Sequence, residues 1–172
     1  MVSKALWTLF IGVVALAVQG SARHLGLPEA AVPQLLVVVV VSLAFSEVNA
    51  FGGVMAFVLG LLLDFSSAVL VGPWAGAFVV VFGALALLSH RLFIESGVVA
   101  MVISGFAVIA ANLLFSVLGA EYPIITWEYP QRIIGQAVVT ALCAPVLLSV
   151  ISRRSRKSAR LFVGRGSPVS AV

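Results

Sequence analysis

The chain has 172 residues, of which 62% are hydrophobic and only 9% are charged, with a formal net charge of +4; its mean hydropathy is +1.22. A soluble domain is nearer half apolar and about a quarter charged. The composition excludes disordered, collagen-like and disulfide-rich chains and argues against a water-soluble enzyme domain. We therefore expect an all-α integral membrane protein.

Six stretches free of Lys, Arg, Asp and Glu follow one another, and each has about the length of one transmembrane helix. We predict a single six-helix transmembrane domain over residues 1–152, followed by a basic tail over 153–172. Five spans are the alternative if the short second and third stretches are miscounted. The six stretches cover residues 5–22, 30–46, 48–63, 65–90, 96–120 and 133–152.

The first stretch has some features of a secretory signal peptide. Lys4 precedes an apolar run, and residues 19–22 (Gln-Gly-Ser-Ala) resemble a cleavage site. Five further stretches follow, and removal of the first would place the new N-terminus on the side opposite the basic tail. We expect the first helix to be retained.

The second and third stretches meet at residues 46–49 (Ser-Glu-Val-Asn), just before Gly52 and Gly53. A single helix over 32–63 would be about 48 Å long, which is too long for a hydrocarbon core of about 30 Å. We therefore predict a tight helical hairpin here.

Three prolines predict local features of the helices. Pro33 and Pro73 are placed in the first turns of the second and fourth helices, where proline is tolerated. Pro145 lies inside the last stretch and predicts a kink.

Basic residues are distributed unevenly over the two sides that six spans define. One side holds Lys4, Arg91 and six tail residues, and the other holds only Arg23 and Arg132. By the positive-inside rule both termini are expected in the cytoplasm. The tail can also attract anionic lipid, and we do not expect it to bind nucleic acid. Its basic residues are Arg153, Arg154, Arg156, Lys157, Arg160 and Arg165.

A stripe of small residues that ends in a carboxylate marks the third stretch. Residues four apart lie on one helix face, and small residues there let helices approach closely in lipid. Either the stripe packs within the chain and the carboxylate makes a helix-end hydrogen bond, or it anchors another subunit. The stripe is Gly52, Ala56, Gly60 and Asp64, and Gly72 and Gly76 repeat the spacing.

The last external loop, residues 121–130, contains Tyr122, Trp127 and Tyr129. Tyr and Trp favour the membrane interface, so one interpretation is an aromatic belt. The other is a surface that meets a partner outside the cytoplasm.

Polar residues inside the stretches are few: Asp64, Asn112, Gln136, Thr140 and scattered serines. No metal-ligand spacing, carboxylate pair or nucleophile motif is present in the sequence. We expect neither catalysis nor a metal or cofactor. The single cysteine, Cys143, is expected to be a small buried hydrophobe.

Residues 53–64 (Gly-Val-Met-Ala-Phe-Val-Leu-Gly-Leu-Leu-Leu-Asp), followed by Val71-Gly72, resemble the signature of the MreD family of rod shape-determining membrane proteins. Residues 32–36 resemble the family's Pro-rich entry into its second helix. Length, span count and the basic C-terminus are similar over nearly the whole chain. The sequence departs from the family pattern at Ala56, where glycine is frequent, and at Gln34, where aspartate or asparagine is frequent.

The resemblance implies a non-catalytic scaffold of the bacterial elongation machinery in the inner membrane. It implies direct binding of MreC and, through the complex, association with MreB, RodA and a class B penicillin-binding transpeptidase. It also implies a fold that resembles the S components of energy-coupling-factor transporters. The candidate packing or partner-contact residues are Gly52, Gly53, Ala56, Phe57, Gly60, Asp64, Gly72 and Gly76.

Two alternatives remain. The chain could be a vitamin-binding S component, but its first stretch lacks the Ala-x-x-x-Ala motif that such proteins use for docking, and few polar groups are available to bind a vitamin. It could also be an intramembrane enzyme or a lipid-handling protein, which the same scarcity of polar groups disfavours.

Overall fold

The computed structural model describes residues 2–26, 28–67, 71–89, 97–119 and 128–163. Within these residues the chain forms α-helices and one short 3-10 helix, with no strand, so the all-α fold class is confirmed. The elements are α1 (Val2–His24), η1 (Glu29–Ala31), α2 (Leu35–Ser46), α3 (Ala50–Ser67), α4 (Pro73–Ser89), α5 (Gly97–Leu118) and α6 (Glu128–Val163).

Five helical segments are long and apolar enough to cross a membrane, which confirms a multi-pass membrane protein. The fourth helix, α4, is apolar but has only 17 residues. The five segments are Ala5–Ala22, Glu29–Ser46, Ala50–Ser67, Gly97–Leu118 and Tyr129–Ile151.

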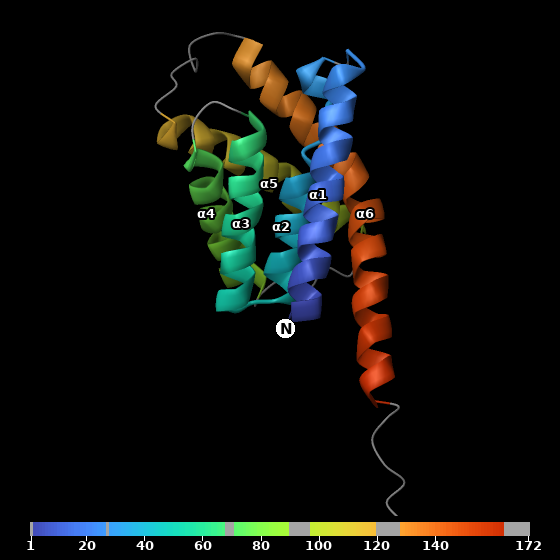
Figure 1. The fold of residues 1–172 in the computed structure, drawn as a ribbon. Coiled ribbons are helices and arrows are strands. Elements are labelled where there is room, and N and C mark those ends of the chain that lie inside the picture. Colours follow the sequence, from blue (N-terminus) through green and yellow to red (C-terminus); the bar gives the residue numbers. More distant parts are fainter. Residues whose placement is uncertain (1, 27, 68–70, 90–96, 120–127, 164–172) are drawn as a thin grey trace, which may run out of the picture.

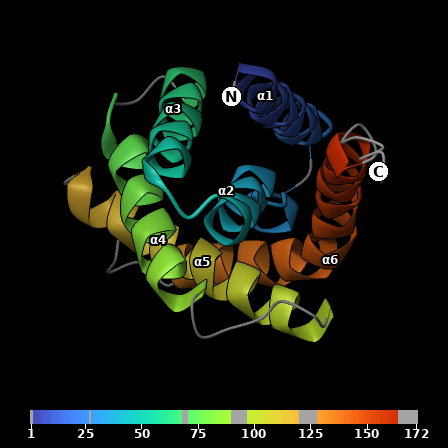
Figure 2. The same cartoon turned by 90° about the horizontal axis from the view of Figure 1, so that it is seen from below.

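The helices form a bundle around α2. Viewed along the bundle, α2 lies at the centre, and the other five helices surround it (Figure 2). Helix α1 begins and helix α6 ends toward the same end of the bundle (Figure 1). This arrangement places η1 near the opposite end, which we call the distal end.

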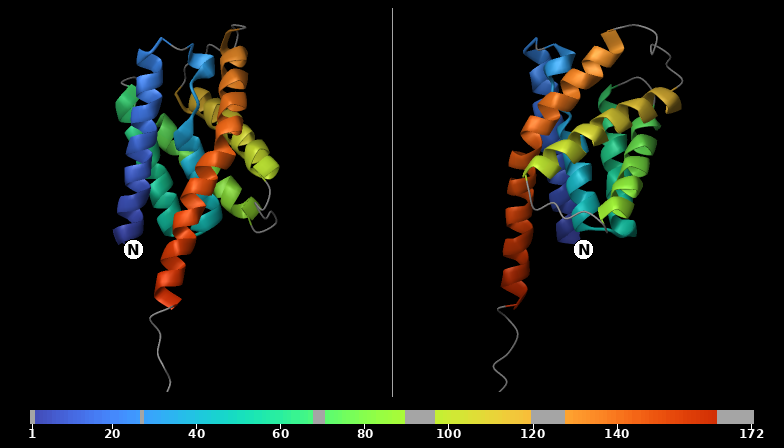
Figure 3. Two further views of the ribbon diagram at one scale, coloured as in Figure 1. Left: turned by 90° about the vertical axis from the view of Figure 1, so that its right-hand side faces the viewer. Right: turned by 180° about the vertical axis from the view of Figure 1, so that it is seen from behind.

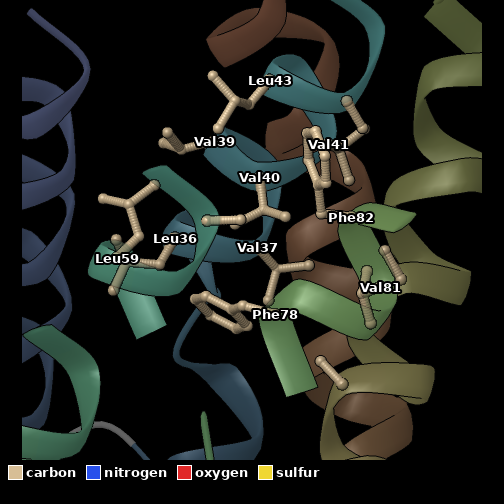
Figure 4. Packing of buried hydrophobic residues seen from close by; sticks show 14 of the residues in the cluster. Leu36, Val37, Val39, Val40, Val41, Leu43, Leu59, Phe78, Val81 and Phe82 are labelled. Atoms are coloured by element: carbon tan, nitrogen blue, oxygen red, sulfur yellow. The ribbon is translucent and has the colours of Figure 1, made fainter. Parts of the chain in front are cut away.

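The central position of α2 follows from its sequence, Leu-Leu followed by five valines, which is apolar on every side. Valine is a modest helix former, and an isolated helix of 12 residues is only marginally stable in water. Packing on all sides therefore accounts for its stability. Figure 4 shows Leu36 beside Leu59 of α3 and Val37 beside Phe78 of α4, all nearly or fully buried.

The predicted hairpin between the second and third helices is confirmed. Helix α2 ends at Ser46, and α3 begins at Ala50. The side-chain Oδ1 of Asn49 accepts a hydrogen bond from the Gly52 N–H at 3.1 Å, which satisfies one of the free N–H groups at the start of α3.

The three prolines have different outcomes. Pro73 is the first residue of α4, as predicted. The prediction for Pro33 is wrong, because α2 begins only at Leu35 and the preceding residues are non-helical. Pro145 lies inside α6, and this helix changes direction between its orange first part and its red second part (Figure 1).

The first and last helices differ in length and packing. Helix α1 packs against α2 and α3, and Gly12 lies so close to Leu59 that a Cβ there would overlap its side chain. Helix α6 has 36 residues and continues to Val163. The predicted boundary at residue 152 therefore falls within a continuous helix.

Candidate functional site

Asp64 lies in the last turn of α3, and its carboxylate caps the start of α4. Its Oδ2 accepts hydrogen bonds from the backbone N–H groups of Gly72 at 2.9 Å and Ala75 at 3.1 Å. Its Oδ1 accepts one from the Trp74 N–H at 3.1 Å. The first N–H groups of a helix lack partners within it, and negative charge there is favourable. Of the two interpretations of Asp64, its contacts match the helix-end hydrogen bond.

Gly72 and Asp64 depend on each other. Gly72 has a φ of +124°, a conformation that residues with a side chain rarely adopt. In this conformation the Gly72 N–H points toward the Asp64 carboxylate. Asp64 is only 1% exposed. Gly72 and Asp64 therefore act together at the start of α4.

Gly60 lets the backbones of α3 and α4 touch. A Cβ at Gly60 would overlap Ala75 Cα and lie 2.7 Å from both the Ala75 amide nitrogen and the Trp74 carbonyl oxygen. At the other end of the stripe, a Cβ at Gly52 would lie 2.6 Å from the Phe82 ring. Ala56, between them, is fully buried. The stripe thus packs within the chain, against α4.

The other residues of the predicted stripe are placed differently. A Cβ at Gly53 would make only ordinary contact with Phe82, at 3.7 Å. Gly76 faces Leu118 of α5, whose Cδ1 would be 3.1 Å from a Cβ. Phe57 is 45% exposed and so is largely uncovered by the other helices.

Of the three aromatic residues of the external loop, Tyr122 and Trp127 lie outside the described residues. Tyr129 is in the first turn of α6, and its hydroxyl group turns toward α5. It pairs with the Ser116 hydroxyl and donates a hydrogen bond to the Asn112 carbonyl oxygen at 3.3 Å. The Arg132 guanidinium lies over its ring, 5.6 Å from the centroid. The Tyr129 hydroxyl is therefore engaged within the chain.

A second polar centre, which we call the amide cluster, joins Gln34, Asn112, Gln136 and Thr140. Gln34 Nε2 donates to Gln136 Oε1 at 2.9 Å and to Asn112 Oδ1 at 3.3 Å. Asn112 Nδ2 donates back to Gln34 Oε1 at 3.3 Å. The backbone N–H of Gln34 donates to Thr140 Oγ1 at 2.8 Å. The amide groups are therefore largely bonded to one another.

The amide cluster holds the non-helical residues that precede α2. Backbone polar groups at membrane depth must be satisfied by the protein itself unless they line a water-filled cavity. The Pro33 carbonyl accepts a hydrogen bond from Gln19 Nε2 of α1 at 3.0 Å. The Glu29 carbonyl accepts one from Gln136 Nε2 at 3.0 Å. Side chains of α1 and α6 thus donate hydrogen bonds to the backbone that precedes α2.

One face of α6 carries most of these contacts. Arg132, Gln136 and Thr140 are four residues apart, and Arg132 pairs with the Glu29 carboxylate at the distal end. Gly135 allows Ala30 of η1 to approach, since a Cβ would lie 2.9 Å from the Ala30 carbonyl oxygen. Gln136 and Thr140 were expected among the few polar residues of the apolar stretches, but no contact with Gln34 was predicted. The spacing of four residues between Arg132, Gln136 and Thr140 on α6 was the signal that could have indicated a shared face.

Among the described residues, no three His, Cys, Asp or Glu side chains gather as metal ligands would. Cys143 is half-buried and free. No protein-family model, curated protein or solved structure matches this chain. The function must therefore be argued from the residues themselves.

Proposed function

We propose that this protein is a non-catalytic membrane scaffold of the MreD type. In this proposal it binds the single-span protein MreC and helps to organise lateral peptidoglycan synthesis in a bacterial inner membrane. MreB, RodA and a class B penicillin-binding transpeptidase would associate through the same complex. The proposal includes a six-span fold that resembles the S components of energy-coupling-factor transporters.

The proposal rests on one observation: the residues that resemble the MreD signature form the contact between α3 and α4. Gly60, Asp64 and Gly72, which carry the resemblance, together build one backbone-to-backbone contact between α3 and α4. Such a contact fixes the positions of two helices relative to each other. A scaffold needs this property, because it must present a constant surface to its partner within the membrane.

The topology in the proposal has six spans with both termini in the cytoplasm. Helix α4, with 17 residues, is at the lower limit for a transmembrane helix, about 17 to 25 residues. The start of α1 and the end of α6 lie toward the same end of the bundle (Figure 1), as an even number of spans requires. The excess of Lys and Arg on that side supports its cytoplasmic placement.

Co-purification tests the proposal. The tagged chain is co-expressed with MreC from the same genome, extracted in mild detergent and purified, and the bound proteins are identified by mass spectrometry. We expect MreC to be retained in comparable molar amount, and an unrelated multi-span protein with the same tag to retain none. Loss of MreC from a folded chain would contradict the proposal. Recovery of a transport ATPase or a vitamin would support an S component instead.

A further inference from the structure

The end of α3 and the residues just before α4 carry large apolar side chains that no other helix covers. We call this part the α3–α4 tip and define it as residues 65–67 and 71–72. Phe65 is 69% exposed and Val71 is 61% exposed, and residues 65–90 contain no Lys, Arg, Asp or Glu. The residues between α1 and α2, by contrast, include Glu29, whose carboxylate pairs with Arg132. Exposure of large apolar side chains to water is unfavourable, so the composition of the tip favours lipid.

The two serine hydroxyls and the Gly72 N–H of the tip have partners within the chain. Ser66 Oγ donates a hydrogen bond to the Leu63 carbonyl oxygen at 2.8 Å. Ser67 Oγ donates to the carbonyl oxygens of Leu63 at 2.9 Å and Asp64 at 3.1 Å. The Gly72 N–H is bonded to the Asp64 carboxylate. At membrane depth polar groups must be satisfied by the protein itself, and these three groups meet that requirement.

Helix α3 ends deeper in the bundle than α1 does. The two helices pack against each other, and both begin near the end opposite the distal end (Figure 1). Helix α1 has 23 residues and α3 has 18, so α3 ends about 7 Å before α1. Both views of Figure 3 show the end of α3 below the end of α1. Helix α1 ends with Arg23 and His24, and charged residues near the ends of spans lie at the headgroups. The tip is therefore below the headgroup level.

The length of α3 indicates the same depth. The helix begins directly after Glu47 and Asn49, polar residues that we expect at the headgroups of the other leaflet. Its 18 residues extend about 27 Å, which is less than a hydrocarbon core of about 30 Å. Helix α3 therefore ends before it reaches the headgroups at the distal end.

We infer that the α3–α4 tip ends inside the membrane and that lipid acyl chains of the distal leaflet cover Phe65 and Val71. A bilayer accommodates a short span by thinning locally, so the distal leaflet is thinner over α3 and α4 than beside α1. A protein partner is a less suitable occupant, since the tip has no charged side chain and both of its serine hydroxyls are already bonded within the chain. The inference concerns lipid and does not depend on the binding of MreC.

Cysteine accessibility tests the depth of the tip. In a Cys143→Ala background, Phe65→Cys and Val71→Cys are placed at the tip, and Leu25→Cys, 80% exposed between α1 and η1, is the matched control. Each variant is reconstituted as a single chain per lipid nanodisc, with no other protein, and is reacted with a charged maleimide that does not enter lipid. Only the thiolate reacts, and hydrocarbon disfavours both the thiolate and the charged reagent. We expect both tip cysteines to react about tenfold or more slowly than Leu25→Cys, and all three to react equally in SDS.

The thickness of the bilayer supplies a second measurement on the same variants. In nanodiscs of lipids with shorter acyl chains the headgroups come closer to the tip. We expect the reaction rates of Phe65→Cys and Val71→Cys to rise toward that of Leu25→Cys, and the rate of Leu25→Cys itself to change little. This dependence on chain length distinguishes cover by lipid from cover by another part of the protein.

Three results would overturn the inference, and none of them bears on the proposed function. Equal rates at the tip and at Leu25→Cys in nanodiscs of the longer lipid would place the tip in water. Slow reaction in native membranes but fast reaction in nanodiscs would show that a protein covers the tip. Slow reaction at every lipid length would show that the chain covers it. The two tip variants are independent, so if one does not fold the other decides.

Discussion

The contact between α3 and α4 and the contact between α2 and α6 both bury polar groups in an apolar bundle, but they are built differently. In the first, one carboxylate accepts three backbone N–H groups that are 8 to 11 residues away in the chain. In the second, neutral side-chain amides bond to one another across 78 and 102 residues. The difference shows that a carboxylate at a helix end is satisfied by nearby backbone, whereas the segment that precedes α2 is held by side chains from distant helices.

From this comparison we expect that removing the carboxylate and removing an amide lower the free energy of unfolding by different amounts. Each Asp64 partner is a backbone N–H that cannot turn away, whereas the amide cluster retains other donors and acceptors when one member is lost. The variants below test this difference, from the largest expected effect to the smallest. Each is measured as the free energy of unfolding of the solubilised protein.

Asp64→Leu is expected to have the largest effect. It leaves up to three buried N–H groups without a partner, each costing about 1–3 kcal/mol, so we expect a loss of about 3 kcal/mol or more. Asp64→Asn keeps one acceptor oxygen and should lose less than half as much. Equal losses for the two variants would show that the carboxylate hydrogen bonds are not what stabilises the start of α4.

Gly60→Ala should come next, because the added methyl group meets the Ala75 and Trp74 backbone, which cannot move away as a side chain could. Overpacking of this kind costs about 1–3 kcal/mol. Gly53→Ala in the same helix is the control, since its Cβ would make only ordinary contact. Its cost should be near zero, and a similar loss in both would contradict the close approach at Gly60.

Gln136→Leu tests the amide cluster. It removes the acceptor for Gln34 Nε2 and the donor to the Glu29 carbonyl, while Gln34 keeps Asn112. We expect a loss of about 1–2 kcal/mol. Gln131→Leu, exposed on the same helix, should change stability little. If Gln136→Leu lowers the free energy of unfolding as much as Asp64→Leu does, the amide cluster does not compensate for the loss of one member, and the proposed difference between the two regions is wrong.

Glu29→Gln should have the smallest effect. The Glu29 and Arg132 side chains are 61% and 44% exposed, and exposed ion pairs contribute less than about 1 kcal/mol. Because salt screens such a pair, the difference between wild type and variant should disappear in about 1 M salt. A difference that persists at high salt would show that the pair does more than join two surface charges.

The two regions also differ in how far sequence predicts them. Gly60 and Asp64 share a spacing within one helix, and Pro73 marks the start of the next, so their contact follows from local pattern. Gln34 gives no such signal, because its partners are on α5 and α6 and no local rule pairs them. The start of α2 was misplaced for the same reason: Pro33 can begin a helix, but tertiary contacts hold it in a non-helical segment instead.

The central claim is that a fixed helical surface in this chain holds a single-span partner. A titration of labelled MreC, with its transmembrane helix intact, into the chain reconstituted in lipid nanodiscs tests it most directly. We predict saturable binding of MreC at a fixed molar ratio. Folded chain with no saturable binding of MreC would contradict the claim.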